Sequence, residues 1–138
     1  MTVIRRAEAA DLPAVAAIQQ ASPGAAHWNV ADYLDHDFLV AVSENRVVGF
    51  LVARTVAPGE SEILNLAVAA ESRRKGVARA LLDRALHSCP GEVFLEVRES
   101  NEVAREFYKS LGFIELSKRA GYYESPSETA VVMKFHSC

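Results

Sequence analysis

The stretch ESRRKGVARALLDRAL, residues 71–86, places three consecutive cations (73–75) and Gly76 directly before an amphipathic helical pattern. Apolar residues recur over 78–86 at the spacing i, i+3, i+4, i+7 and i+8, and charged residues fill the opposite side. A helix start combines unpaired backbone N–H groups with the positive end of the helix dipole. The stretch therefore predicts a surface helix packed on a sheet, with a candidate phosphate site at its beginning.

Strand patterns lie on both sides of this helix. The segment SEILNLAVAA, 61–70, is apolar on both faces, which is typical of a central strand, and EVFLEVRES, 92–100, alternates apolar and polar residues. A strand, a helix and a strand in this order indicate a parallel crossover. With the helices and strands that the patterns indicate before and after this unit, the sequence predicts an α/β fold. We expect a mixed central β-sheet of about seven strands flanked by about four helices.

Size and composition restrict the class of protein. The chain has 138 residues, half of them apolar, and this fits one globular domain over 1–138. It contains no apolar run of the ~18 residues that a membrane span needs and no signal peptide, so we expect a cytoplasmic protein with no membrane partner. A net charge of −3 argues against a nucleic-acid partner. The two cysteines and four histidines show no ligand spacing, so no metal is expected.

The basic helix start matches neither common nucleotide-binding motif. The chain lacks both the P-loop pattern and the G-x-G-x-x-G pattern. What it contains is R-x-x-G-x-A, formed by Arg73, Gly76 and Ala78, whose small residues allow close approach to backbone N–H groups. Taken alone, this pattern also fits a basic helix start that binds nothing.

Five ordered segments give the pattern its context: LNLAV (64–68), RRKGVARALL (73–82), LEVRESN (95–101), FYKSLGF (107–113) and KRAGYYESPSETAVVM (118–133). With them the chain resembles the GCN5-related N-acetyltransferase (GNAT) family over essentially its whole length. Within that family it is most similar to the bacterial ribosomal-protein-alanine (RimI-like) N-acetyltransferases. The resemblance implies the GNAT fold and acetyl-CoA as co-substrate, with its pyrophosphate at the R-x-x-G-x-A motif. It implies cofactor contacts from Leu66, Ala67, Val68, Arg73, Arg74, Lys75, Gly76, Val77, Ala78, Arg79 and Asn101.

Glu96 is the candidate general base. Acetyl transfer to an amine requires a neutral nitrogen, and an α-amine with a pKa of ~7.8 is partly neutral at pH 7, whereas a lysine with a pKa of ~10.4 is almost never neutral. Glu96 shares one face of its strand with Phe94 and Arg98, where strands usually carry apolar surface. It is either an ordinary strand glutamate, exposed or paired with Arg98, or a base. The resemblance implies a base that acts directly or through water.

Aromatic residues complete the expected site. Tyr108 follows Glu96 by twelve residues on the apolar stripe of the next helix, where tyrosines commonly belong to the core. The resemblance implies that it protonates the departing coenzyme A sulfur. Trp28, Tyr122 and Tyr123 are either ordinary packing residues at loop edges or, as the resemblance implies, walls of the peptide site.

The sequence therefore predicts a peptide α-N-acetyltransferase. We expect it to form a ternary complex with acetyl-CoA and a protein N-terminus, such as that of a ribosomal protein, whose first residue is small, such as alanine. An acetyltransferase of a small-molecule amine is the alternative, because the fold and cofactor site do not determine the acceptor. A non-catalytic acyl-CoA-binding module would need neither Glu96 nor Tyr108.

Overall fold

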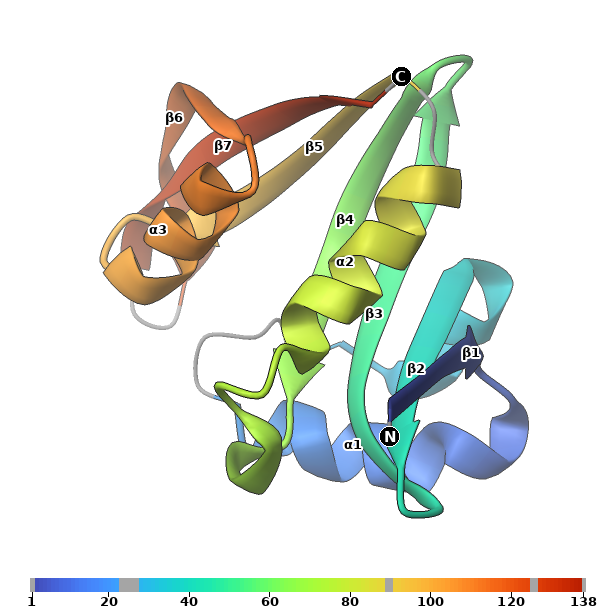
Figure 1. Ribbon diagram of the computed structural model, residues 1–138. Coiled ribbons are helices and arrows are strands. Elements are labelled where there is room, and N and C mark those ends of the chain that lie inside the picture. The colour runs from blue at the N-terminus through green and yellow to red at the C-terminus, as the bar shows by residue number, and fades with distance from the viewer. Residues whose placement is uncertain (1, 23–27, 89–90, 125–126, 138) are drawn as a thin grey trace. The chain divides into compact units, whose positions relative to one another are not determined.

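The structure, a computed structural model, describes residues 2–22, 28–88, 91–124 and 127–137, and the side chains of 121–127 and 137 are outside this description. The chain divides into two compact units (Figure 1). The first unit consists of Met1–Arg54 and Ile63–Ser88, and the second consists of Thr55–Glu62 and Cys89–Cys138.

The strands of the first unit follow the order β1-β2-β3-β4. They are β1 (Thr2–Arg6), β2 (Asp37–Ser43), β3 (Arg46–Ala57) and β4 (Glu60–Val68). β1 pairs antiparallel with β2, and β2 pairs antiparallel with β3. The β2–β3 turn has positive φ at Glu44 (52°) and Asn45 (63°), the type I′ geometry that matches the twist of a two-residue hairpin. Both strands are apolar on both faces, because helices cover each side of the sheet.

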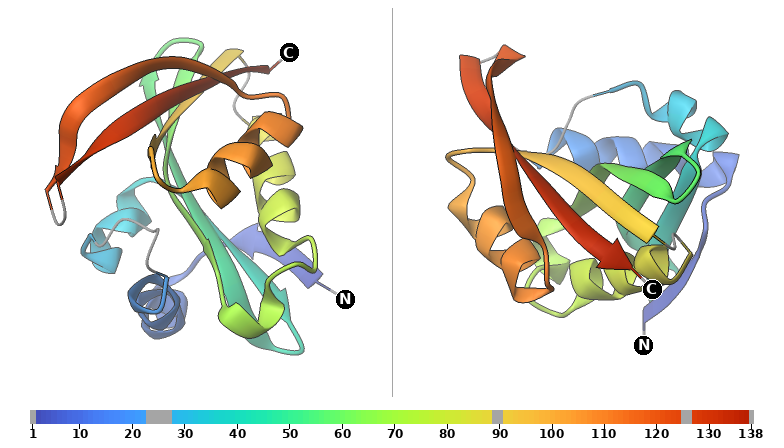
Figure 2. Two further views of the ribbon diagram at one scale, coloured as in Figure 1. Left: turned by 90° about the vertical axis from the view of Figure 1, so that its left-hand side faces the viewer. Right: turned by 90° about the horizontal axis from the view of Figure 1, so that it is seen from above.

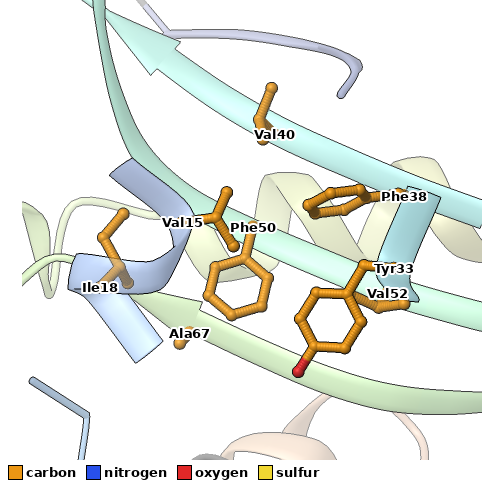
Figure 3. Packing of buried hydrophobic residues seen from close by; sticks show 8 residues of the cluster. All are labelled: Val15, Ile18, Tyr33, Phe38, Val40, Phe50, Val52 and Ala67. Atoms are coloured by element: carbon orange, nitrogen blue, oxygen red, sulfur yellow. The ribbon is translucent and has the colours of Figure 1, made fainter. Parts of the chain in front are cut away.

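Helices α1 (Leu12–Gln20) and α2 (Val77–Ser88) lie on opposite faces of these strands (Figure 2). On the α1 face, Phe50 and Val52 of β3 belong to a buried cluster with residues of α1, β2, β4 and the 3-10 helix η2 (Val30–Asp35) (Figure 3). On the α2 face, a Cβ added to Gly49 would lie 3.1 Å from a Val77 side-chain atom and 3.2 Å from one of Leu81. The absence of a side chain at position 49 therefore lets α2 pack closely on β3.

Short polar side chains determine where the first helices begin. Asn29 precedes η2 and its Oδ1 accepts the N–H of Ala31 at 3.1 Å. Asp11 ends the short 3-10 helix η1 (Ala9–Asp11) and precedes α1, but its carboxylate accepts the N–H of Glu8 and two bonds from the Arg5 guanidinium. Arg5 lowers the pKa of Asp11 through these bonds, against the opposing effect of burial. The pair ties β1 to the start of α1.

The second unit contains β5 (Gly91–Arg98), β6 (Ile114–Glu124) and β7 (Ser127–Ser137), in the order β5-β7-β6 and antiparallel throughout. The tip of the β3–β4 hairpin belongs to it, because the Gly59 carbonyl accepts the N–H of Glu92 at 2.8 Å. Helix α3 (Glu102–Ser110), labelled in Figure 1, packs through aromatic residues on the strand face that carries Phe135. It ends at Ser110, followed by the C-cap Leu111 and by Gly112, which has φ +104° as expected for a residue after a helix end.

The predicted α/β fold with seven strands is confirmed. The 3-10 helix η2 begins after Asn29, a residue type that favours helix starts. The last two strands are long, with 11 residues each. That residues 1–138 form one domain stays a prediction.

Candidate active site

The end of β4 carries the first predicted cofactor residues. Leu66 is half-buried, whereas Ala67 and Val68 are buried. The N–H of Leu66 donates to Oδ1 of Asn65 at 3.0 Å, and the carbonyl of Val68 accepts from Nε of Arg73 at 3.0 Å. Because the side chains of Ala67 and Val68 belong to the interior, a ligand at this strand end would be bound by backbone groups.

The chain then reaches α2 through a 3-10 turn, η3 (Ala70–Ser72), and two residues with left-handed backbone. Arg74 has φ +63° and Gly76 has φ +79°. A Cβ added to Gly76 would have no atom within 4 Å, so the space beside this residue is open. Such a conformation is costly for a residue with a side chain, and here it turns the chain directly into the helix start.

The start of α2 fits a phosphate group. Val77 is buried, Ala78 is half-buried, and Arg74, Lys75 and Arg79 are exposed cations. The first N–H groups of a helix have no acceptor within it, and they lie beside the open space at Gly76. Residues 74–79 therefore fit the role that the resemblance implies for them, which is to hold the pyrophosphate of acetyl-CoA. When bound, acetyl-CoA would supply an activated acetyl thioester.

Arg73 forms hydrogen bonds that stabilise the loop before α2. Its Nε donates to the Val68 carbonyl, and its Nη2 lies 3.4 Å from Oγ of Ser22, just after α1. The guanidinium thus ties the loop to the end of β4 and to the end of α1. Its contacts differ from those of Arg74 and Lys75, for which the sequence predicts the same phosphate role.

Glu96 lies on β5 with its side chain 14% exposed. Its neighbours Leu95 and Val97 are buried on the other face of the strand, as the alternation predicts. Its Oε1 accepts a hydrogen bond from Nη1 of Arg119 at 2.6 Å. Its Oε2 is buried and has no hydrogen-bond partner among the described residues. Arg98, the partner that the sequence suggests, forms an ion pair with Glu128 at 3.4 Å.

Tyr108 lies on α3 and is half-buried. Its ring centroid is 5.4 Å from that of Phe107 and 5.5 Å from that of Phe113, and Phe113 in turn contacts Phe135 of β7. Asn101 caps this helix, because its Oδ1 accepts the N–H of Ala104 at 3.2 Å. The predicted acid thus belongs to an aromatic cluster, and the predicted cofactor residue Asn101 already has a role in starting α3.

The two predicted catalytic residues lie on opposite faces of the second unit's strands. Phe135 is the partner of Val93 in the β5–β7 register, and directly opposed residues share a face. Val93 and Glu96 have opposite parity along β5, so Glu96 is on the face away from the helix that carries Tyr108. The geometry therefore provides a carboxylate on one side and a hydroxyl on the other.

The residues predicted to bind the acceptor are described in part. Trp28 is 47% exposed, and its carbonyl accepts a bond from Nε2 of Gln19 at 2.7 Å. Tyr122 and Tyr123 lie within β6, but their side chains are outside the described part of the chain. The exposure of Trp28 agrees with either a binding wall or a residue at a loop edge.

A buried polar network beneath β4 has no counterpart in the sequence prediction. The hydroxyl of Tyr33 donates to Oε1 of Gln19 at 2.5 Å, and Nδ2 of Asn65 donates to both residues at 3.0 and 3.1 Å. Burial raises the pKa of Tyr33. Since Gln19 also binds the carbonyl of Trp28 and Asn65 binds the N–H of Leu66, the network holds two predicted site residues. The polar residues at 19 and 65 within apolar segments were the only signal of it.

The described residues contain no group of three or more His, Cys, Asp or Glu side chains that could hold a metal ion. In the same residues no helix has the length and apolar character needed to cross a membrane.

Comparison with known proteins places this geometry in a family. A sequence model described as "Acetyltransferase (GNAT) family" matches residues 5–113. The [Ribosomal protein bS18]-alanine N-acetyltransferase of Escherichia coli K12 is 30% identical, over 96% of this chain and 96% of its own. An N-alpha-acetyltransferase of Saccharolobus solfataricus is 34% identical over 70% of this chain and 66% of its own.

A solved structure shows the same relationship. Ard1 from Thermoplasma volcanium superposes with a TM-score of 0.90 at 32% sequence identity, over 97% of this chain and 96% of that chain. The family match covers the candidate cofactor loop, Glu96 and Tyr108. The chain belongs to the acetyltransferase (GNAT) family.

Proposed function

We propose that this protein transfers the acetyl group of acetyl-CoA to the N-terminal α-amine of a protein. The observation that carries the proposal is Glu96, a carboxylate on a central strand. One of its oxygens is held by Arg119, and the other is buried with no hydrogen-bond partner in the described part of the chain. A carboxylate oxygen in this state can accept a proton from an incoming amine. Relatives named as alanine and α-amine acetyltransferases support the same activity.

In the proposed reaction, Glu96 and Tyr108 each transfer one proton, and other residues hold acetyl-CoA. Glu96 accepts the proton that the amine nitrogen loses as its bond to the acetyl carbon forms. Tyr108 donates its hydroxyl proton to the sulfur as the carbon–sulfur bond breaks, and regains a proton from solvent. The backbone at Leu66, Ala67 and Val68 and the loop at 73–79, together with Asn101, hold acetyl-CoA. Both substrates are present together in a ternary complex, so no acetyl group is attached to the enzyme.

The acceptor is a protein N-terminus with a small first residue such as alanine. An α-amine suits a single carboxylate base, because its pKa of ~7.8 leaves a useful neutral fraction at pH 7. Trp28, Tyr122 and Tyr123 orient the peptide. A ribosomal protein is the acceptor that the bS18-alanine relatives suggest, and the reaction then takes place in the cytoplasm.

The test is a panel of peptides that share one sequence and differ in the first residue. We expect fast acetylation of alanine- and serine-starting peptides with acetyl-CoA, and fragmentation spectra should place the acetyl group on the α-amine. A peptide with a blocked N-terminus and an internal lysine is the control and should not react. Acetylation of lysine, or of polyamines and aminoglycosides alone, would contradict the proposal and favour a different acceptor class.

Variants then test the assigned roles. Glu96→Gln and Tyr108→Phe should each lower kcat by about 10²–10⁴-fold, the range typical of a positioned acid or base. Both should bind acetyl-CoA with nearly wild-type affinity, because neither residue is proposed to hold it tightly. A folded Tyr108→Phe enzyme with kcat within a few-fold of wild type would show that Tyr108 serves only the aromatic cluster and that solvent protonates the sulfur.

A further inference from the structure

The ion pair between Arg119 and Glu96 crosses the full width of the three-stranded part of the sheet. Arg119 lies on β6 opposite Ala130 of β7, and Ala130 lies opposite Arg98 of β5. Glu96 is two residues away on β5, so the Arg119 side chain must pass over β7 to reach it. A small residue at 130 leaves room for this path, and Nη1 of Arg119 lies 2.6 Å from Oε1 of Glu96.

The neighbouring pair Lys118–Glu99 provides an internal comparison. Its charged atoms are also 2.6 Å apart, but it lies on the other face, and its side chains are 58% and 40% exposed. Exposed pairs of this kind contribute little to stability. Glu96, in contrast, is 14% exposed, so its contact with Arg119 is shielded from water on the carboxylate side.

The second carboxylate oxygen of Glu96, Oε2, indicates the role of the Arg119–Glu96 ion pair. A buried carboxylate oxygen without a partner costs free energy, and a pair that served only stability would be expected to satisfy both oxygens. Arg119 binds Oε1, and none of the described side chains donates to Oε2. The bond to Oε1 restricts rotation of the carboxylate, and Oε2 can accept a proton.

We propose that Arg119 is a positioning residue for the base: it holds Glu96 so that Oε2 receives the proton of the acceptor amine. The inference rests on the proposed function, because it assigns Arg119 a role through Glu96. Arg119 itself does not exchange a proton. It acts on the chemical step rather than on the binding of acetyl-CoA.

The experiment is a double-mutant cycle measured with one alanine-starting peptide. The enzymes are wild type, Arg119→Gln, Glu96→Gln and the double variant, with Arg119→Lys to restore the charge without the planar guanidinium. Lys118→Gln is the matched control, since it removes the same charge from the adjacent residue and breaks an ion pair of the same length. Circular dichroism and thermal unfolding verify that each variant is folded.

We expect Arg119→Gln to lower kcat by about 10–100-fold, the scale of a misplaced catalytic group, with the KM for acetyl-CoA within about threefold of wild type. Arg119→Lys should recover part of the loss, and Lys118→Gln should keep nearly wild-type kcat. In the Glu96→Gln background, Arg119→Gln should cause no further loss, because the group that it positions is gone.

The outcomes separate this inference from the proposed function. If Arg119→Gln lowers kcat by the same factor in both backgrounds, or if Lys118→Gln is equally harmful, the positioning role is wrong while the base assignment stands. If Glu96→Gln alone keeps wild-type kcat, the base assignment is wrong and the inference is overturned with it.

Discussion

Gly76 allows the cofactor loop to be tested without ambiguity about folding. The residue has φ +79°, and an added Cβ would meet no atom within 4 Å. Replacing it by tyrosine therefore costs backbone strain, but the new Cβ meets no atom of the protein. A tyrosine side chain would occupy the open space before α2, where the pyrophosphate is expected.

The expected loss of stability and the expected loss of affinity for acetyl-CoA have different sizes. A side chain in the left-handed region costs about 1–2 kcal/mol, which for a chain of this size lowers the Tm by about 3–10 °C. Loss of two hydrogen bonds between backbone N–H groups and a phosphate, at about 1.5–3 kcal/mol each, lowers the affinity for acetyl-CoA by at least about 100-fold. The loss of affinity should therefore greatly exceed what the modest loss of stability could explain.

Gly59 supplies the matched control. It has φ +74° and equally open surroundings, but it lies in the β3–β4 turn, outside the predicted cofactor residues. Gly59→Tyr should show the same fall in Tm as Gly76→Tyr, with wild-type affinity in calorimetric titration with acetyl-CoA. If Gly76→Tyr is folded and binds acetyl-CoA as tightly as Gly59→Tyr does, the loop does not hold the pyrophosphate and the reasoning from its geometry is wrong.

Two further predictions concern the framework around the site. Because Arg5 lowers the pKa of Asp11, the pair stabilises the fold fully above the unfolded pKa of ~3.9 and loses this contribution as pH falls through the folded pKa. Asp11→Asn should lower the free energy of unfolding by about 1–2 kcal/mol at pH 7. The variant should also lose less of this free energy than wild type as the pH falls below ~4, as urea titrations at several pH values would show. An equal dependence of the free energy on pH in both proteins would contradict this. Asn65→Ala removes two buried hydrogen bonds and one half-buried hydrogen bond and should cost about 2–4 kcal/mol. Asn29→Ala, at an exposed cap, should cost about 1 kcal/mol; similar urea midpoints for the two variants would refute the importance of the network.

Local features of the fold could be predicted from the sequence because they depend on neighbouring residues. The alternation of β5 places Glu96 opposite the buried Leu95 and Val97, and the structure agrees. Asn29 and Gly112 stand at the helix boundaries that their chemistry favours. These features require no knowledge of distant contacts.

Long-range contacts could not be predicted in this way. The partner of Glu96 is set by the β6–β7 register, which shifts between Glu115 and Ser117 and again between Arg119 and Tyr123. A slip of one residue would place Lys118 on that face instead. Arg73 is a similar case, since its contacts with Val68 and Ser22 depend on how the loop folds back and not on the charge pattern around it.

Glu96 and Tyr108 belong to opposite faces of the strands, and this has a consequence for the proposed proton transfers. If the proposed roles hold, the proton that leaves the amine is collected on one face, and the proton that reaches the sulfur is supplied from the other. The backbone amides that β5 shares with β7 are engaged in the strand ladder and cannot relay protons. We therefore expect each residue to restore its own protonation state by exchange with the surrounding buffer. Solvent isotope effects on the two transfers should then behave as two independent contributions and not as one concerted relay.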